Sequence, residues 1–395
     1  MTQETLHVPS ELQKEISTVR HPIQIGIPKE DQKTEKRLAF TPEAIDLLEE
    51  AGYEIVFEAG AGCGIRYSDA DYAEAGAMIT DERSTVFGCD LIFKITPPTI
   101  EEIQWMKKRA TVLSMLQMPD INHELIKAMA AKQIHAVGYE LMSPDGSCFP
   151  VRDAISEMEG AAAISVASEL LSNEKGGKGI LLGGVPGVSP TEVVIIGAGV
   201  AGAVAARAAL ALGATVKVFD SDIDKLRRLQ RQLGTPVFTS VFHPNVLVNT
   251  FESADVVIGA MRYIDDSVRY VITEDVIRTM KKSAVVIDLR INQGGCFETT
   301  CYLPAGHPAV FEKAGILHYC VPNLSSRVAR TASMALSNIF IPFILRMGEL
   351  GGLTAIASAD PGFRSGFYLY SGKLVNSYVA KYFNLPANDV GLFLF

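Results

Sequence analysis

The sequence predicts an α/β protein with two domains, each built on a parallel sheet that helices cover. Short apolar runs rich in β-branched residues alternate with helical stretches from Ile23 onward, which is the pattern of such sheets. The chain has 395 residues, of which 48% are hydrophobic, and a single core stops growing beyond roughly 250–300 residues. A second α/β series begins at Val193, after a glycine-rich stretch. Two cores are therefore expected.

The first domain is predicted from five apolar runs. Ile23–Ile27 indicates a strand, and Thr41 and Pro42 then cap and open a helix that Gly52 closes. The other strands of this series are predicted at Tyr53–Glu58, Leu91–Thr96, Thr111–Leu116 and Ile134–Tyr139. A further helix is predicted over Ile121–Lys132, between the last two of these strands.

The second domain is predicted to follow a long helix. Ile155–Ser172 lacks proline and clustered β-branched residues, which favours a helix leading away from the first series. The stretch Gly176–Pro190, GGKGILLGGVPGVSP, is either a linker or a loop that frames a cleft. The strands of the second series are predicted at Val193–Gly197, Thr215–Phe219, Val256–Ile258, Ala284–Asp288 and Ile316–Val321.

The C-terminal segment is expected to return to the first domain. A helical pattern covers Ala329–Leu345, and an aromatic tail containing GFYLYSG at Gly366–Gly372 follows it. Because this segment is too small to fold alone, we expect it to pack on the first domain, which is then discontinuous. The predicted division is residues 1–150 and 329–395 for the first domain and residues 151–328 for the second.

Composition argues against several classes of protein. The 36 Lys and Arg and the 45 Asp and Glu give a net charge of −9, and the basic residues are scattered, so nucleic acid is not an expected partner. The N-terminus is polar, and no run approaches the roughly 20 apolar residues that a bilayer requires, so we expect a cytoplasmic protein without a membrane partner. The 6 cysteines are dispersed without a CxxC pair, which favours reduced thiols and predicts no metal site.

The segment VVIIGAGVAG predicts a dinucleotide site. Gly197, Gly199 and Gly202 follow a predicted strand directly and open a helix. Glycines there permit a tight turn, close approach of the backbone to a pyrophosphate and close helix packing, while the helix N-terminus favours negative charge. The strand Thr215–Phe219 ends in Asp220, whose carboxylate can accept hydrogen bonds from an adenosine ribose. The second domain is therefore predicted to be a doubly wound dinucleotide-binding domain, and both domains to be Rossmann-like.

Asp220 also favours NAD over NADP. Its charge would repel a phosphate on the ribose, and the two residues that follow it supply no cation. The cations of the next helix, Lys225, Arg227 and Arg228, are interpreted as a solvated helix face rather than a phosphate clamp. We expect the nicotinamide half of the cofactor beside the carboxyl ends of the later strands, since ligands gather there in parallel sheets.

Longer motifs resemble a known family. Six segments between about Ile23 and at least Leu345 together resemble the alanine dehydrogenase and pyridine nucleotide transhydrogenase alpha-subunit family. They are IGIPKE, EKRLAFTPEAIDLL, GAGCGIRYSDADYAEAGA, GGKGILLGGVPGVSP, DLRINQGGCFETT and HYCVPNLSSRVARTAS. QGGCFE makes the resemblance closer to alanine dehydrogenase. The resemblance implies hydride exchange between C4 of a nicotinamide and the α-carbon of an amino or imino acid in a cleft between the domains. For alanine, the products would be pyruvate, ammonia and NADH.

The resemblance also implies roles for single residues. Arg37 matches the arginine that holds the substrate carboxylate, and a guanidinium fork suits that anion, although its charged run KTEKR alone indicates a surface residue. Ser156 matches the serine of the family's SEVAG segment, and Asn323 matches an asparagine near the nicotinamide, with a structural role as the alternative. The expected cofactor-binding residues are Ser156, Gly197, Ala198, Gly199, Val200, Gly202, Asp220 and Asn323.

Three positions depart from the family's catalytic pattern. Where the family strand carries two lysines in KVKEP, this chain keeps Lys94 and has Thr96 in place of the second. Residues two apart on a strand share a face. Lys94 therefore either reaches part of the space that the missing lysine would occupy or serves only as a structural cation. Gln117 replaces the catalytic histidine and cannot exchange protons near neutral pH, and Asn292 replaces an aspartate. The expected catalytic residues are Arg37, Lys94, Gln117 and Asn292.

Three functions remain open at this stage. The first is an NAD-dependent oxidoreductase acting on alanine or another small amino or imino acid, with His135 or His318 as candidates for the missing proton carrier. The second is an NAD(H)-binding sensor that has lost its chemistry, and the third is a soluble transhydrogenase-like component. A small amino acid or oxoacid is the expected ligand. The apolar helix Ala332–Gly348 either supports a homo-oligomer, a hexamer or dimer, or belongs to the core of one chain.

Overall fold

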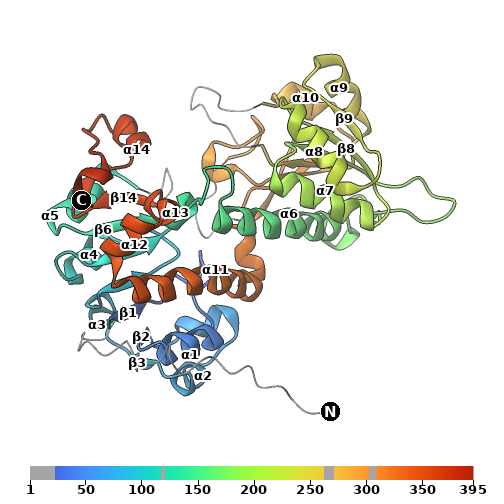
Figure 1. Cartoon of the computed structure of the whole chain (residues 1–395). Helices are drawn as coiled ribbons and strands as arrows, with labels where there is room; N and C mark the ends of the chain where they lie inside the picture. Colours follow the sequence, from blue (N-terminus) through green and yellow to red (C-terminus); the bar gives the residue numbers. More distant parts are fainter. Residues whose placement is uncertain (1–22, 117–120, 262–270, 302–307, 395) are drawn as a thin grey trace, which may run out of the picture.

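The computed structural model describes residues 23–116, 121–261, 271–301 and 308–394. These residues form two α/β bodies, one from both ends of the described chain and one from its middle (Figure 1). Each body contains one mostly parallel sheet. The predicted α/β class with two parallel sheets is confirmed.

The first sheet has eight strands in the order β15-β14-β6-β5-β4-β1-β2-β3. Its parallel strands are β1 (Gln24–Ile27), β2 (Glu54–Glu58), β3 (Met78–Thr80), β4 (Leu91–Phe93), β5 (Thr111–Ser114) and β6 (His135–Gly138). β14 (Phe367–Tyr370) and β15 (Lys373–Leu374) add an antiparallel edge beside β6. The C-terminal segment thus completes the first sheet.

The second sheet has seven strands in the order β12-β13-β11-β10-β7-β8-β9. Its strands are β7 (Glu192–Ile196), β8 (Thr215–Phe219), β9 (Phe238–Ser240), β10 (Val256–Gly259), β11 (Val285–Asp288), β12 (Val310–Lys313) and β13 (Ile316–Tyr319). All of them are parallel except β12, which pairs antiparallel with β13. Every residue of β10 and β11 is buried, as expected for strands with helices on both faces.

Helices cover both sheets. Those of the first body are α1 (Pro42–Glu50), α2 (Asp69–Glu74), α3 (Arg83–Phe87), α4 (Ile100–Trp105), α5 (His123–Ala131), α11 (Ala329–Leu350), α12 (Leu353–Ala359), α13 (Pro361–Arg364) and α14 (Ser377–Tyr382). Those of the second body are α7 (Val200–Ala211), α8 (Ile223–Leu233), α9 (Pro244–Ser253) and α10 (Glu274–Arg278). Short 3-10 helices connect several of these elements.

The helix α6 (Pro150–Leu170) joins the two bodies. Val151 and Ile155 near its start belong to the first hydrophobic core, whereas Ala163 and Ala167 near its end belong to the second. In Figure 1, α6 runs along the second body, and α11 extends from the first body toward it. The two bodies are therefore joined by α6, whose two ends belong to different cores.

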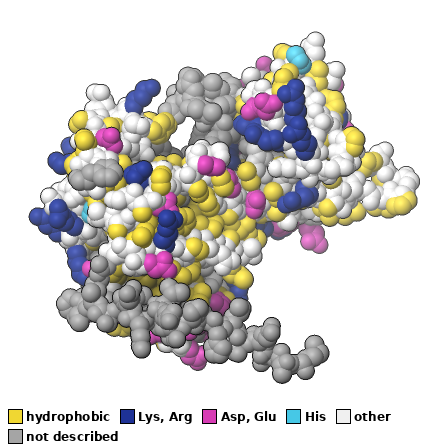
Figure 2. All heavy atoms as spheres, in the orientation of Figure 1, with side chains coloured by type: hydrophobic (Ala, Val, Ile, Leu, Met, Phe, Trp, Pro, Cys, Tyr) yellow, Lys and Arg dark blue, Asp and Glu magenta, His cyan; other side chains and the backbone are white. Residues whose placement is uncertain are grey.

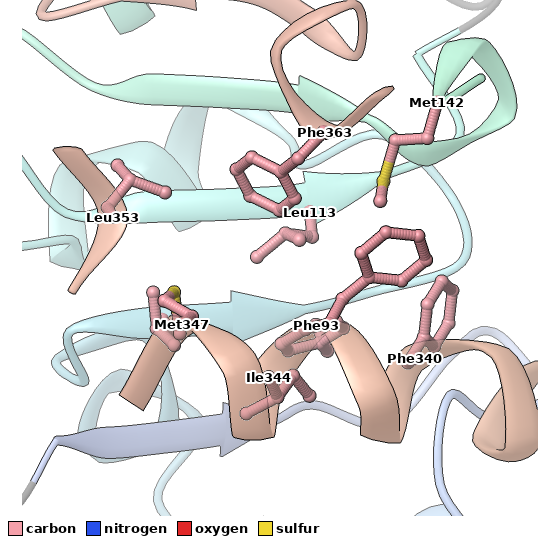
Figure 3. Close-up of a pocket in the computed structure, with 10 residues that line it drawn as sticks. Phe93, Leu113, Met142, Phe340, Ile344, Met347, Leu353 and Phe363 are labelled. Carbon is pink, nitrogen blue, oxygen red and sulfur yellow. The ribbon is translucent and has the colours of Figure 1, made fainter. Parts of the chain in front are cut away.

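The helix α11 is long and apolar enough to cross a membrane by length and composition alone. The core helix of a soluble protein passes the same test, and Leu336, Phe340, Ile344 and Met347 of α11 are buried in the first core. Figure 3 shows Phe340, Ile344 and Met347 facing Phe93 of β4 across a small pocket whose lining residues are all apolar. These contacts support the core-helix interpretation of α11.

Several strand boundaries differ from the sequence prediction. The strand predicted at Leu91–Thr96 ends at Phe93, because the carboxylate of Glu30 accepts hydrogen bonds from the backbone N–H groups of Ile95 and Thr96. Lys94 and Thr96 therefore lie beyond the strand, although the Lys94 ammonium donates a 2.6 Å hydrogen bond to the Thr96 hydroxyl, so the two side chains lie on the same side. The strands β3, β9, β12, β14 and β15 were not predicted. Four of them are short strands at sheet edges, which give little apolar periodicity, whereas β14 is buried between β15 and β6.

Candidate active site

The glycine-rich loop between β7 and α7 has the form that a dinucleotide requires. Gly197 has a φ of +111°, which L side chains rarely adopt. A Cβ on Gly202 would lie 1.9 Å from the carbonyl oxygen of Gly197, so only glycine allows this close packing of helix on loop. A Cβ on Gly199, the N-cap of α7, would have no neighbour within 4 Å among the described residues, which leaves open space at the N-terminus of that helix. Ala198 and Val200 complete the loop.

Asp220, which directly follows β8, is hydrogen-bonded to this loop. Its carboxylate accepts a 2.7 Å hydrogen bond from the backbone N–H of Ala198 and a 2.9 Å bond from that of Asp222. Each carboxylate oxygen retains acceptor capacity, so Asp220 is suited to hold ribose hydroxyls as well. Arg227 pairs with Asp224 on the exposed face of α8, in agreement with a solvated helix face. The loop and Asp220 together fit a pyridine dinucleotide.

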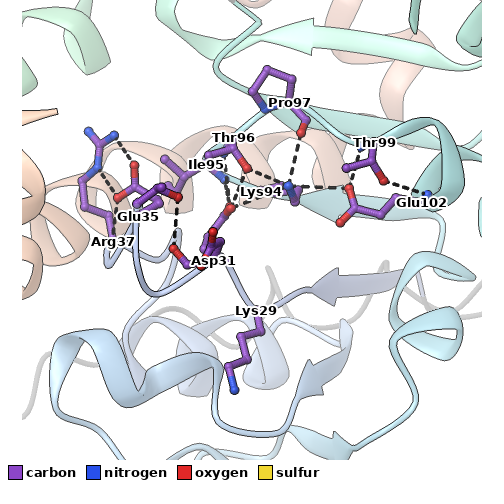
Figure 4. A network of polar contacts seen from close by, with 12 residues as sticks. Lys29, Asp31, Glu35, Arg37, Lys94, Ile95, Thr96, Pro97, Thr99 and Glu102 are labelled. Atoms are coloured by element: carbon purple, nitrogen blue, oxygen red, sulfur yellow. Dashed lines mark hydrogen bonds and ion pairs between the residues drawn. The ribbon is translucent and has the colours of Figure 1, made fainter. Parts of the chain in front are cut away.

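Arg37 is buried at the boundary between the two bodies, not on the surface (Figure 4). Its Nε and Nη2 donate 2.8 Å and 2.7 Å hydrogen bonds to the two carboxylate oxygens of Glu35. Nη2 also donates to Oδ1 of Asn323 at 2.8 Å, and Nη1 donates to Oγ of Ser325 at 3.0 Å. Burial works to lower the pKa of Arg37, but the Glu35 carboxylate outweighs it and raises that pKa. These bonds occupy four of the five guanidinium N–H groups.

Lys94 lies in the first body, in the same network of polar contacts that Figure 4 draws around Arg37 and Glu35. Its Nζ donates to the Thr96 hydroxyl at 2.6 Å and to the Pro97 carbonyl at 3.2 Å. Glu30 and Glu102 flank the ammonium at 3.6 Å and 3.5 Å. Burial raises the pKa of Glu30, and the charge of Lys94 partly offsets that rise. These contacts hold the Lys94 ammonium within the first body.

The carboxyl end of β11 carries a second buried acid, Asp288. Its carboxylate accepts 2.7 Å hydrogen bonds from the Thr300 hydroxyl and the backbone N–H of Cys296, and burial raises its pKa. The backbone N–H of Arg290 donates to the same carboxylate at 2.9 Å. This arrangement fixes the loop in which Asn292 lies, within a 3-10 helix at Ile291–Gln293. Asp288 was not predicted as a functional residue, although a charged residue at the end of an apolar strand can be recognised in the sequence.

Two residues of α6 face the boundary between the bodies. Ser156 is 5% exposed, and Glu159, one turn later on the same face, is 7% exposed. Burial raises the pKa of the Glu159 carboxyl, while Arg290 and Arg37 act to lower it. Glu159 was missed by the sequence analysis. The available signal was weak, because Glu159 lies two residues after Glu157 and directly before the run of small residues GAAA.

The remaining predicted residues lie elsewhere. Gln117 is outside the described residues. His135 is the first residue of β6, at the end of the strand opposite its carboxyl end, and packs edge-on against Tyr370. His318 lies inside β13, where its ring nitrogens contact the Thr299 hydroxyl and the Ile316 carbonyl. Neither histidine lies with Arg37 and Glu159. Within the described part of the chain, no group of three His, Cys, Asp or Glu side chains is arranged to hold a metal ion.

Charge on the surface is dispersed. On the face shown in Figure 2, Lys and Arg side chains form separate groups with Asp and Glu among them, rather than one continuous stripe.

Known proteins resemble this chain along most of its length. The family model described as Alanine dehydrogenase/PNT, N-terminal domain, matches residues 26–159, and the corresponding C-terminal domain model matches residues 163–377. The alanine dehydrogenase of Staphylococcus saprophyticus is 34% identical over 366 residues, covering 93% of this chain and 98% of the relative. Alanine dehydrogenase 2 of Staphylococcus aureus is 34% identical over 368 residues, with the same coverage of 93% and 98%.

Solved structures agree with these relatives. An L-alanine dehydrogenase structure has a TM-score of 0.85 and 29% identity, covering 92% of this chain and 99% of that one. A transhydrogenase from Sinorhizobium meliloti has a TM-score of 0.75 and 24% identity, covering 90% and 99%, and shows the fold alone. The resemblance found in the sequence motifs is confirmed, and this chain belongs to the alanine dehydrogenase/PNT family.

Proposed function

We propose that this chain is an NAD-dependent alanine dehydrogenase, which converts L-alanine, NAD⁺ and water to pyruvate, ammonia and NADH, or which acts on another small amino acid. The observation that carries the proposal is the meeting of Arg37, Asn323 and the α6 residues Ser156 and Glu159 between a dinucleotide loop and the first sheet. An anion-binding arginine beside a nicotinamide site suits an amino-acid carboxylate. The relatives named alanine dehydrogenase support the same substrate.

NAD is proposed as the cofactor in preference to NADP. The loop Gly197–Gly202 would hold the pyrophosphate at the N-terminus of α7, and Asp220 would accept hydrogen bonds from the adenosine ribose. A ribose phosphate beside the Asp220 carboxylate would be repelled. Bound NAD⁺ supplies the hydride acceptor at C4 of its nicotinamide. Ser156 and Asn323 are proposed to contact the nicotinamide half.

The substrate would be oriented by hydrogen bonds and charge. Arg37 is proposed to anchor the carboxylate through the N–H group of Nη1 that its protein partners leave available. Gln117 and Asn292 would orient the carbonyl or imine as neutral hydrogen-bonding groups. Lys94 is proposed to act indirectly, because its contacts with Glu30, Glu102 and Thr96 fix the loop after β4.

The proposal is tested by an absorbance assay at the nicotinamide band. Purified protein should form NADH from NAD⁺ with alanine, and should consume NADH with pyruvate and ammonia. A panel of small amino acids identifies the preferred substrate, and replacing NAD⁺ by NADP⁺ should reduce the rate. Absence of turnover in both directions with the whole panel would contradict the proposal.

A second candidate function is an NAD(H)-binding sensor without chemistry. It is favoured by Thr96, Gln117 and Asn292, each of which is neutral where the family resemblance implies an ionisable group. Tight NADH binding in a calorimetric titration, combined with no turnover, would identify this alternative. A soluble transhydrogenase component has weaker support, because the transhydrogenase match extends to the fold alone.

A cytoplasmic homo-oligomer, a dimer or hexamer, is proposed as the working form. Because α11 lies in the core of the first body, it gives little support for a subunit interface. Better support comes from Leu181, Val185 and Val188 in the glycine-rich stretch after α6, which are 64%, 49% and 66% exposed. Apolar side chains grouped in this way indicate a contact surface. Light scattering on the purified chain measures the oligomeric state directly.

A further inference from the structure

Glu159 is a buried carboxylate to which no residue in the described part of the chain donates a hydrogen bond. Its side chain is 7% exposed, and charged groups buried this deeply are paired as a rule. Among the described residues, none donates a hydrogen bond to Glu159 or forms an ion pair with it; Arg290 and Arg37 act on it only at longer range. A carboxylate kept in such surroundings indicates a function other than stability.

The position of Glu159 is fixed by the adjacent glycine. A Cβ on Gly160 would lie 2.3 Å from the carbonyl oxygen of Ala201, so α6 rests directly on the first turn of α7. Arg290 lies two residues beyond the carboxyl end of β11, and Arg37 belongs to the first body. Glu159 therefore lies where the dinucleotide loop, the nicotinamide edge of the sheet and the carboxylate-binding arginine meet.

The two arginines near Glu159 differ in how many of their N–H groups are hydrogen-bonded. Arg37 is held by Glu35, whereas Nε of Arg290 has no hydrogen-bond partner in the described part of the chain. Two other charged residues near α6 have partners of their own. Glu140 accepts a 2.7 Å bond from Tyr368, and Arg327 pairs with Glu169 near the far end of α6.

We infer that Glu159 is the proton-exchanging residue of this site, an inference that rests on the proposed dehydrogenase function. Amino-acid oxidation requires a group that takes a proton from the substrate ammonium, and Thr96, Gln117 and Asn292 cannot do so at neutral pH. Glu159 has the required chemistry, and no described residue forms a hydrogen bond or ion pair with its carboxylate. A carboxylate also suits the cationic ammonium of the substrate, opposite the arginine that takes its carboxylate.

The proton steps balance in the deamination direction. An N–H bond of the α-ammonium breaks, and its proton forms an O–H bond on Glu159. The nitrogen lone pair then forms the C=N bond as the α-hydrogen leaves with its electron pair to NAD⁺, the oxidant. Water adds to the iminium carbon and releases a proton. Glu159 then protonates the nitrogen, and the C–N bond breaks to release ammonia as the hydroxyl loses its proton to give pyruvate.

Burial around Glu159 serves this role. It raises the pKa of the carboxyl above its usual value, and Arg290 and Arg37 partly offset the rise, which brings the group toward the pH at which a general base is most effective. Because the base must be ionised to accept a proton, the rate of alanine oxidation should fall as the pH drops through this raised pKa.

The test compares Glu159→Gln, Glu159→Asp and the matched control Glu169→Gln with the wild-type protein. Glu169 lies on the same helix, and its side chain is 42% exposed. Glu159→Gln should lower kcat by about 10²–10⁴-fold and lose the acidic limb of the pH profile, while NADH binding by titration stays close to wild type. Glu159→Asp should keep that limb at a reduced rate, and Glu169→Gln should match the wild type.

A measurement independent of turnover follows the carboxyl directly. Infrared difference spectra of the wild-type protein across a pH titration should contain a carboxyl that protonates above the usual pH range of glutamate, and Glu159→Gln should lack this band. If the wild type is active and Glu159→Gln keeps both its rate and the acidic limb of its pH profile, the inferred role of Glu159 is overturned while the proposed function stands. A wild-type spectrum without the carboxyl band would overturn that role as well. An inactive wild-type protein would overturn the proposed function and this inference with it.

Discussion

Arg37 and Asn323 lie 286 residues apart in the chain and are joined by a 2.8 Å hydrogen bond from Nη2 to Oδ1. Nδ2 of Asn323 in turn donates a 2.7 Å bond to Oε2 of Glu35, the oxygen that also accepts from Nη2 of Arg37. The three side chains close a ring across the boundary between the two bodies. The orientation of the proposed carboxylate anchor therefore depends on a residue of the dinucleotide-binding half.

Replacing Asn323 by alanine should loosen this ring. The change leaves an N–H of Arg37 without a buried partner and removes one of the two donors to Oε2 of Glu35, which costs about 1–3 kcal/mol of stability. The KM for alanine should rise because the guanidinium is no longer held in place. Urea denaturation and steady-state kinetics measure the two effects.

The control for this substitution is Asn384→Ala. Asn323 and Asn384 both have positive φ, +63° and +53°, so both variants carry the same backbone cost. Asn384 is exposed, and its substitution should leave KM unchanged. Equal effects of the two substitutions on stability and KM would show that the ring contributes nothing beyond backbone conformation.

Replacing Arg37 by methionine should destabilise the protein more strongly. Glu35, whose side chain is 1% exposed, would be left as a buried carboxylate without its cation, and removing one partner of a buried pair costs about 3–5 kcal/mol. The double variant Glu35→Gln with Arg37→Met should recover part of this loss, because the uncompensated charge is removed. Urea titrations of the wild type, Arg37→Met, Glu35→Gln and the double variant give the coupling energy between the two side chains. Strictly additive changes in the free energy of unfolding would contradict a coupled pair.

The glycine loop offers a pair of alanine substitutions with opposite expected effects. Gly202→Ala places a Cβ 1.9 Å from the Gly197 carbonyl oxygen and should lower the melting temperature before any ligand is added. Gly199→Ala meets no described atom within 4 Å and should fold normally, yet weaken NADH binding by crowding the space at the N-terminus of α7. Calorimetry with and without NADH measures both. Normal NADH affinity in Gly199→Ala would place the pyrophosphate elsewhere.

The sequence was informative where local pattern decides structure. The predicted strand Thr215–Phe219 matches β8 residue for residue, and the glycine spacing after Val193 predicted the turn that the structure contains at Gly197. Apolar periodicity and the conformational demands of glycine act over a few residues, so a single sequence carries them. The fold class and the dinucleotide loop could therefore be predicted without a structure.

Contacts between distant residues could not be predicted in the same way. The direction of the Lys94 ammonium depends on Glu30 and Glu102, which belong to other elements. Arg37 lies in a charged run and is nevertheless buried, because Glu35 and Asn323 satisfy its guanidinium. Glu159 looks like a solvated helix residue until the structure brings two arginines near it. Burial of charge depends on tertiary partners, and no local pattern encodes them.

Stability should depend on pH through His135. Burial lowers the pKa of this imidazole to about 4 in the folded protein, with a further contribution from the charge of Arg109, whereas an unfolded chain has a value near 6.5. The unfolded state therefore binds a proton more readily below pH 6.5. The stability that neutral His135 contributes is complete above that pH and is lost as the pH falls toward 4, by roughly 3 kcal/mol in total.

Urea unfolding at a series of pH values between 4 and 7.5 measures this dependence. The variant His135→Gln cannot take up the proton, so its stability should decline less steeply than that of the wild type over the same range. The exposed His243 provides the control, since His243→Gln should retain the wild-type slope. A His135→Gln protein whose stability falls as steeply as the wild type would assign the acid sensitivity to buried carboxyl groups instead.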